Sequence, residues 1–128
     1  MTTDHAHDLI HEYVDAWKSG DASRVERIVT PDCEVIESHG PTFTGRGEIR
    51  SWIEEWTRRS SVVTRWDLQE IVHAGARASV EWRFECVDLQ TRYVIDGVSM
   101  FEFRDGLIAS IREYRRTDDP YPGLQKKR

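Results

Sequence analysis

The sequence predicts a single α+β domain in which three N-terminal helices cover one face of an antiparallel sheet. Two observations carry this prediction. Apart from a short strand pattern at residues 33–38, apolar residues recur with the helical period up to Ser61, and after it they alternate as they do in strands. Helices followed by consecutive strands are typical of the α+β class. The 128 residues suit one domain, with a core domain expected over residues 6–116 and a surface tail over residues 117–128.

The first predicted helix has one continuous apolar face. Its members are Leu9, Ile10, Tyr13, Val14 and Trp17. Gly20 is expected to end this helix, because glycine adopts the left-handed conformation of a helix C-terminus at little cost.

Two further helices are predicted in the first half of the chain. One follows the capping residue Asp21 and ends at Thr30-Pro31. Its inward residues are Val25, Ile28 and Val29. The other follows Gly45, and its inward residues are Ile49, Trp52, Ile53 and Trp56.

Five strands are predicted from alternating patterns. They cover residues 33–38, 62–73, 76–87, 93–103 and 107–116. Ala74-Gly75 and Arg104-Asp105-Gly106 are expected to be turns. Asp96-Gly97 interrupts the fourth strand, and we expect a β-bulge there; a two-residue hairpin turn is the alternative.

Composition excludes several classes of function. The formal net charge is −5, and the only basic run is Lys126-Lys127-Arg128, so no nucleic-acid partner is expected. Cys33 and Cys86 lie in apolar strand patterns and are expected to be buried reduced thiols. No signal peptide and no membrane-spanning run is predicted, so we expect a cytoplasmic protein without a membrane partner.

Three runs of residues resemble a known superfamily. They are residues 13–21 (YVDAWKSGD), 45–49 (GRGEI) and 101–108 (FEFRDGLI). Their order and spacing resemble the nuclear transport factor 2-like superfamily, and within it the SnoaL-like polyketide cyclases and the ketosteroid isomerases. The resemblance implies a cone-shaped curved sheet with an internal pocket at its open end, and a dimer formed through the sheet.

The resemblance to ketosteroid isomerases implies acid–base chemistry without a cofactor. In that family a carboxylate moves a proton while a tyrosine and a protonated aspartic acid hold the enolate oxygen. Tyr13 matches the tyrosine, Glu37 matches the carboxylate, and Ser99 stands at the position of the aspartic acid. Asp96 would supply the missing acid if a bulge brought it into phase with Ser99.

A weaker resemblance to limonene epoxide hydrolases would give roles to other residues. Arg83-Phe84-Glu85 would correspond to that family's Arg-x-Asp, and Glu113 to its second aspartate. Strand alternation opposes this assignment, because an inward Phe84 requires Arg83 and Glu85 to face outward.

Strand alternation also predicts two inward carboxylates, Glu37 and Glu113. Burial beside apolar groups raises the pKa of a carboxyl, which suits proton transfer near neutral pH. Glu113 is expected to pair with Tyr13, to act as a second acid, or to be neutralised by Arg115 or Arg65.

Aromatic residues are predicted to line a hydrophobic ligand pocket. They are Trp17, Trp52, Trp56, Trp82, Phe84 and Phe101. His39 is expected near the pocket mouth, where it could assist proton transfer. His7 and His11 lie one helical turn apart, but no third ligand is evident, so no metal site is predicted.

These features favour a small cofactor-independent enzyme that moves a proton on a small hydrophobic carbonyl compound. Glu37 would be the base, with Tyr13 and Ser99 at the developing oxyanion. The alternative is a domain of the same fold that binds a ligand or accompanies a larger enzyme without catalysis. A homodimer is expected through the outer face of the sheet. That face is predicted to carry Ser79, Glu81, Arg83, Glu85, Ile108, Ser110, Arg112 and Tyr114.

Overall fold

The computed structural model describes residues 1–117, which form three helices and six strands. The tail expected over residues 117–128 therefore lies almost entirely outside the described residues. In chain order the elements are α1 (Thr3–Ser19), α2 (Ala22–Glu26), β1 (Val29–Glu37), β2 (Thr42–Thr44), α3 (Gly45–Arg58), β3 (Val62–Ala74), β4 (Arg77–Asp88), β5 (Thr91–Arg104) and β6 (Leu107–Arg115).

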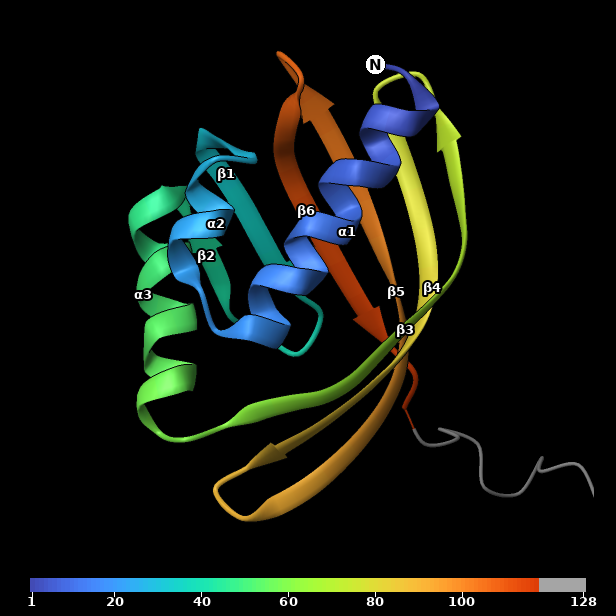
Figure 1. Ribbon diagram of the computed structural model, residues 1–128. Coiled ribbons are helices and arrows are strands. Elements are labelled where there is room, and N and C mark those ends of the chain that lie inside the picture. The colour runs from blue at the N-terminus through green and yellow to red at the C-terminus, as the bar shows by residue number, and fades with distance from the viewer. Residues whose placement is uncertain (118–128) are drawn as a thin grey trace, which may run out of the picture.

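All six strands belong to one curved sheet with the order β2-β1-β6-β5-β4-β3. Every pairing is antiparallel as predicted, except that β1 runs parallel to β6. Helix α1 lies across one face of the sheet, and β3, β4 and β5 sweep round beneath α3 (Figure 1). The α+β prediction and the curved sheet are confirmed. None of the helices within residues 1–117 is long and apolar enough to cross a membrane.

The helix predictions hold, with one boundary corrected. All five predicted inward residues of α1 are buried, and Gly20 ends the helix at a φ of 71°. Asp21 caps α2 by accepting a hydrogen bond from the backbone N–H of Ser23 at 3.0 Å. Helix α2 is shorter than predicted, because Val29 already begins β1 beside Ile108 of β6. An apolar residue buried at a strand start gives the same signal as one on a helix.

The predicted irregularity at Asp96-Gly97 is wrong. Strand β5 pairs with β4 residue by residue from Thr91 to Glu102 without a shift of register. The turn lies instead at Leu89-Gln90, where both residues have positive φ. The register shifts of the sheet lie in β3, between β5 and β6, and between β1 and β6.

The β5–β6 bulge also corrects one face assignment. Glu102 pairs with Ser110 while Phe103 pairs with Ile108, so Ala109 is an extra residue of β6. The bulge reverses the alternation before it, and Ile108 faces the core with 0% exposure. Ile108 is therefore no part of the outer face.

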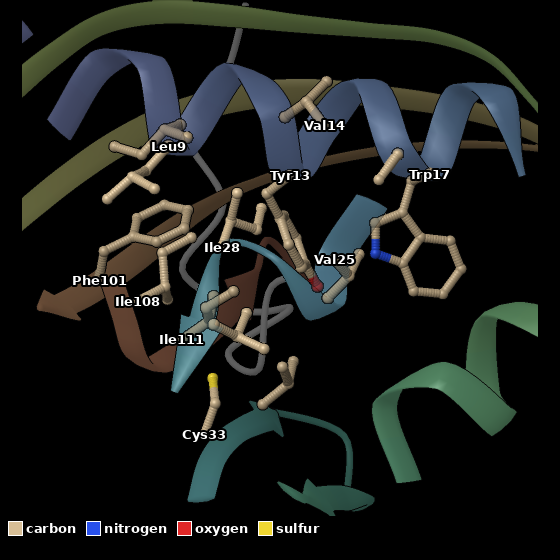
Figure 2. Close-up of a cluster of buried hydrophobic side chains, with 14 of the residues drawn as sticks. Leu9, Tyr13, Val14, Trp17, Val25, Ile28, Cys33, Phe101, Ile108 and Ile111 are labelled. Atoms are coloured by element: carbon tan, nitrogen blue, oxygen red, sulfur yellow. The ribbon is translucent and has the colours of Figure 1, made fainter. Parts of the chain in front are cut away.

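The main core lies between α1 and the concave face of the sheet. Tyr13 points from α1 into a cluster that includes Val25, Ile111 and Cys33 (Figure 2). Both cysteines are buried and free, as predicted. Above this packed layer, toward α3 and the swept ends of β3–β5, the interior opens into a cavity.

Candidate active site

A cavity of about 320 Å³ lies among α1, α3 and the curved strands. Its lining residues are Trp17, Glu37, Ser38, His39, Trp52, Trp56, Trp66, Trp82, Phe84, Cys86, Asp88, Tyr93, Ile95, Glu113, Tyr114 and Arg115. The volume is at the small end of the range for small-molecule sites. Aromatic side chains from helices and strands make most of the wall, and the acidic side chains in it are Glu37, Asp88 and Glu113.

Glu37 and Glu113 stand side by side in this wall. Glu37 ends β1 and Glu113 lies near the end of β6, and the parallel pairing puts the two residues in register. Neighbouring strands lie about 4.8 Å apart, and residues in register point to the same face. The backbone N–H of Ser38 donates to the carbonyl of Glu113 at 2.9 Å, which fixes this pairing beyond the strand. Sequence alternation predicted both residues inward, and their adjacency comes from the parallel pairing.

Glu113 is held as a hydrogen-bond acceptor by a buried relay. The hydroxyl of Ser99 donates to Glu113 Oε2 at 2.8 Å, and the indole Nε1 of Trp82 donates to Ser99 Oγ at 2.8 Å. The single hydroxyl hydrogen of Ser99 is thus already used. Ser99 is 2% exposed and does not line the cavity, so in this geometry it positions Glu113 and offers no donor to a ligand.

The two carboxyls divide one proton unequally. Burial raises the pKa of Glu37 to about 8, and the charge of Glu113 and a hydrogen bond to it act in the same direction. Burial also raises the pKa of Glu113, but hydrogen bonds from Ser99 and Glu37 favour its ionised form. Two neighbouring carboxylates cannot both ionise cheaply. Within the pair, Glu37 is therefore the better proton donor and Glu113 the better proton acceptor.

Tyr13 lies beneath the cavity and does not line it. Its ring packs edge-on against Trp66 at 6.3 Å and Phe101 at 6.4 Å between ring centroids. Its buried hydroxyl has no well-formed hydrogen bond within residues 1–117, although the indole of Trp17 is close enough to moderate its pKa. Burial and the charge of Glu113 raise that pKa, so the phenol stays protonated. Phe101 was predicted to line the pocket, but it belongs to the same packed layer as Tyr13 and does not line the cavity.

His39 and Arg115 lie at the exposed mouth of the cavity. Partial burial and the nearby charge of Arg115 lower the pKa of His39, which keeps the imidazole neutral at pH 7. Neither residue forms an ion pair with Glu37 or Glu113 within residues 1–117. Neutralisation of Glu113 by Arg115 or Arg65 is therefore not observed; Arg65 pairs with Asp67 instead.

Asp88 is the third acid in the wall, and its charge is matched. Arg59 donates to Asp88 Oδ2 at 2.8 Å, and the hydroxyl of the buried Ser61 donates to the other oxygen. These contacts tie the turn after α3 to the end of β4 and hold one side of the cavity in place.

Asp96 and Arg83 lie on the outer face of the sheet, as alternation predicted for Arg83. They form a two-point ion pair, with Nε–Oδ1 at 2.9 Å and Nη2–Oδ2 at 3.1 Å. Glu85 also faces outward and pairs with Arg92 at 2.7 Å. Asp96 therefore cannot supply the missing acid, and the arginine expected from an epoxide hydrolase-like site does not reach the cavity.

Five of the six predicted pocket aromatics line the cavity, namely Trp17, Trp52, Trp56, Trp82 and Phe84. Trp66 and Tyr93 were missed as lining residues. Trp66 is inward and buried on β3, but the bulges of that strand break the alternation that would have revealed it. Tyr93 pairs with Cys86 across β4 and β5, a register that depends on the turn at Leu89-Gln90.

No group of three or more metal-ligating side chains is gathered anywhere within residues 1–117. The Nε2 of His7 is buried without a partner, and His11 is exposed. The cavity also offers no glycine-rich phosphate loop, so its chemistry rests on the two carboxyls and the aromatic wall.

Comparison with known families places this geometry in context. A family model described as a SnoaL-like domain matches residues 10–111. Comparison with curated proteins finds no match.

Many solved structures share the fold. A limonene epoxide hydrolase-like epoxide hydrolase from M. tuberculosis is 19% identical, with a TM-score of 0.81 over 95% of this chain and 90% of that chain. A proposed polyketide cyclase from Xanthomonas campestris is 24% identical, with a TM-score of 0.70 over 87% and 90%. A protein of ketosteroid isomerase-like fold from Catenulispora acidiphila, in complex with trimethylamine, is 16% identical, with a TM-score of 0.72 over 83% of each chain. These similarities concern the fold, which hosts several activities.

Proposed function

Because the chain belongs to the family of SnoaL-like domains, we propose that it is a small acid–base enzyme that moves a proton on a hydrophobic carbonyl compound. The reaction is enolisation followed by return of the proton, as in an isomerisation or a cyclisation. No cofactor is required for either step.

The observation that carries the proposal is the Glu37–Glu113 pair, one acid and one base in the wall of an aromatic cavity. Glu113 removes a proton from the carbon next to the carbonyl, and Glu37 gives its proton to the carbonyl oxygen. The products are a neutral enol, a protonated Glu113 and an ionised Glu37, so protons and charge balance. Reversal of the two transfers at a different carbon completes an isomerisation.

This division of roles differs from the sequence-based hypothesis, in which Glu37 is the base and Tyr13 and Ser99 hold an oxyanion. In the present geometry Ser99 is already hydrogen-bonded to Glu113, and Tyr13 is separated from the cavity. The two groups expected to hold the oxyanion therefore do not face a ligand, and within residues 1–117 the unpartnered indole N–H groups of Trp17, Trp56 and Trp66 are the buried donors that line the cavity. Proton donation by Glu37 avoids the enolate, which supports concerted acid–base action.

Hydrogen exchange tests the proposal without knowledge of the natural substrate. A panel of small cyclic ketones and enones in D₂O is followed by proton NMR for loss of the protons next to the carbonyl. We expect accelerated exchange for some members, lowered about 10²- to 10⁴-fold in Glu37→Gln and Glu113→Gln. Glu81→Gln, a change of the same kind on the exposed outer face, is the control. Exchange that survives both cavity variants would remove the pair from the mechanism.

The second candidate function is ligand binding without catalysis. It is favoured by the positions of Ser99 and Tyr13, the two groups expected to hold an oxyanion, which do not line the cavity. Saturable binding of carbonyl compounds with no exchange in any of them would favour this reading. An epoxide hydrolase-like activity is the less favoured alternative, since the arginine that it would use is paired with Asp96 outside the cavity.

A homodimer through the outer face of the sheet completes the proposal. That face carries the exposed Val94, 49% exposed, and Tyr114, which is 47% exposed and also borders the cavity, beside the Arg83–Asp96 and Arg112–Glu102 ion pairs. Such a mixture of aromatic and charged groups is typical of an interface. Sedimentation at micromolar concentration is expected to give the dimer mass, and Tyr114→Arg to weaken it; a monomer mass for the unmodified chain would refute the dimer.

A further inference from the structure

Arg115 at the cavity mouth lowers the pKa of Glu37 by its charge but forms no ion pair with the Glu37–Glu113 pair. Within residues 1–117 neither carboxyl forms an ion pair, whereas Asp88, the other acid of the cavity, is matched by Arg59. A buried charge is costly unless an opposite charge lies beside it. The space beside this pair is the cavity itself, so a ligand is the group that can supply the missing charge.

The aromatic wall has the geometry that surrounds a compact cation. Trp17 stands nearly perpendicular to Trp52 and Trp56, with ring centroids 4.6 and 6.1 Å apart. On the facing strands Trp66 is nearly perpendicular to Trp82 and Phe84, at 6.1 and 5.1 Å. Rings set at right angles bound a cavity on several sides, and ring faces attract ammonium groups, most strongly those of tryptophan.

An anionic ligand would meet the opposite situation. Its charge would lie beside the carboxyl pair, and the hydroxyl of Ser99 already donates its hydrogen to Glu113. Arg115 is the one cationic lining residue among those described, and it is exposed at the mouth.

We propose that the cavity binds a small organic cation, an alkylammonium group whose positive charge rests between the tryptophan wall and the Glu37–Glu113 pair. The inference uses the cavity of the proposed function and narrows its ligand to compounds with an alkylated amine. It requires binding only and no proton transfer.

Binding of a cation is coupled to the protonation of the pair. Burial and the charge of Glu113 hold the pKa of Glu37 high, and a cation beside the pair favours the doubly ionised form. The other titratable or charged groups around the cavity are His39, Cys86, Asp88, Tyr93, Tyr114 and Arg115, with Tyr13 beneath it. His39 and Arg115 at the mouth repel a cation when both are charged. Protonation of His39 at acid pH therefore weakens cation binding, as protonation of Glu37 does. Affinity for a cation is therefore expected to rise with pH, with release of a proton on binding.

Choline and its neutral isostere 3,3-dimethylbutan-1-ol test the inference on the unmodified protein. Both present the same branched shape, and calorimetry compares their affinities at about pH 6 and about pH 8.5, on either side of the pKa of Glu37. We expect choline to bind roughly tenfold or more tightly than the alcohol at the higher pH. Two buffers of different ionisation enthalpy are expected to reveal proton release with choline alone.

Variants assign the preference to the pair and the wall. Glu37→Gln is expected to reduce the preference for choline and to abolish proton release, and Trp56→Leu to weaken choline more than the alcohol. Glu81→Gln removes the same charge from the outer face and is expected to change neither. Equal or tighter binding of the alcohol, or no binding of choline, would overturn the inference. If a neutral ketone shows hydrogen exchange that depends on the Glu37–Glu113 pair, but choline is not preferred, the proposed function holds and the cation inference fails. If choline is preferred but no ketone shows exchange, the cation inference holds and the proposed function fails.

Discussion

One oxygen of Glu113 receives the hydroxyl hydrogen of Ser99, and that contact favours the ionised form of Glu113 over that of Glu37. The contact is directional because Ser99 in turn accepts from the indole of Trp82. Because the hydroxyl of Ser99 always donates to Glu113, the ionised form of Glu113 is stabilised more than that of Glu37, and Glu37 is the better proton donor. Ser99, which stands at the position expected to hold an oxyanion, therefore positions Glu113, the proposed base.

Ser99→Ala is expected to lower the free energy of unfolding by about 1–3 kcal/mol, because it leaves buried polar partners unsatisfied. It is also expected to raise the pKa of Glu113 and move the acid limb of the pH–rate profile to higher pH. Urea unfolding and the exchange assay measure the two effects. Ser110→Ala is the matched control, since the buried hydroxyl of Ser110 has no partner within residues 1–117. Equal behaviour of the two variants would contradict the relay.

Neighbouring groups of β4 and β6 leave no room for a side chain at Gly97 of β5. A Cβ on this residue would lie 2.4 Å from the carbonyl oxygen of Tyr114 and 2.5 Å from Cη2 of Trp82. The absence of a side chain lets the indole of its cross-strand partner Trp82 lie over the strand and reach Ser99. Gly97 therefore serves the site through packing, and the strand continues through it without a turn.

Gly97→Ala is expected to destabilise the fold by about 1–3 kcal/mol, since backbone and a buried indole must both move. Gly47→Ala in α3 is the matched control, because nothing lies within 4 Å of its added Cβ. That control is expected to be neutral or stabilising by up to about 1 kcal/mol, as alanine favours helix. Chemical denaturation compares the two variants, and a Gly97→Ala protein as stable as the Gly47→Ala protein would contradict the close approach.

Local sequence patterns predicted the helices and strands but missed how distant strands pair. Alternation placed Glu37 and Glu113 inward and Arg83 outward, because these positions lie in regular strand segments. It failed at Ile108, where an extra residue in β6 reverses the faces. The adjacency of Glu37 and Glu113 depends on the register of β1 and β6, which are distant in sequence, and the cavity position of Trp66 depends on bulges in β3. Such register leaves no trace in the period of a single strand.

For the whole molecule, the cavity is a source of instability that depends on pH. The pKa of Glu37 is about 8 in the folded chain and 4.5 when unperturbed. Since the folded value is raised, the unfolded chain loses this proton first as pH rises. The contribution of Glu37 to stability is complete below its unperturbed pKa and is lost as pH rises through the folded pKa.

Stability of the unmodified chain is therefore expected to fall relative to Glu37→Gln as pH rises from about 5 to about 8, by at most about 1.4 kcal/mol per pH unit. Urea unfolding of both proteins across this range gives the difference. Glu34→Gln, on the exposed face of the same strand, is expected to run parallel to the unmodified chain. Parallel curves for Glu37→Gln as well would show that Glu37 keeps an ordinary pKa.

The most direct test of the shared proton is a carbon-13 NMR titration of the glutamate side-chain carboxyls. The unmodified protein is expected to show one carboxyl, assigned to Glu37 by its loss in Glu37→Gln, that titrates near pH 8. In Glu113→Gln the pKa of Glu37 is expected to fall, because the neighbouring charge is gone while burial remains. A spectrum in which every glutamate carboxyl is fully ionised by about pH 6 would contradict the acid–base pair on which this account rests.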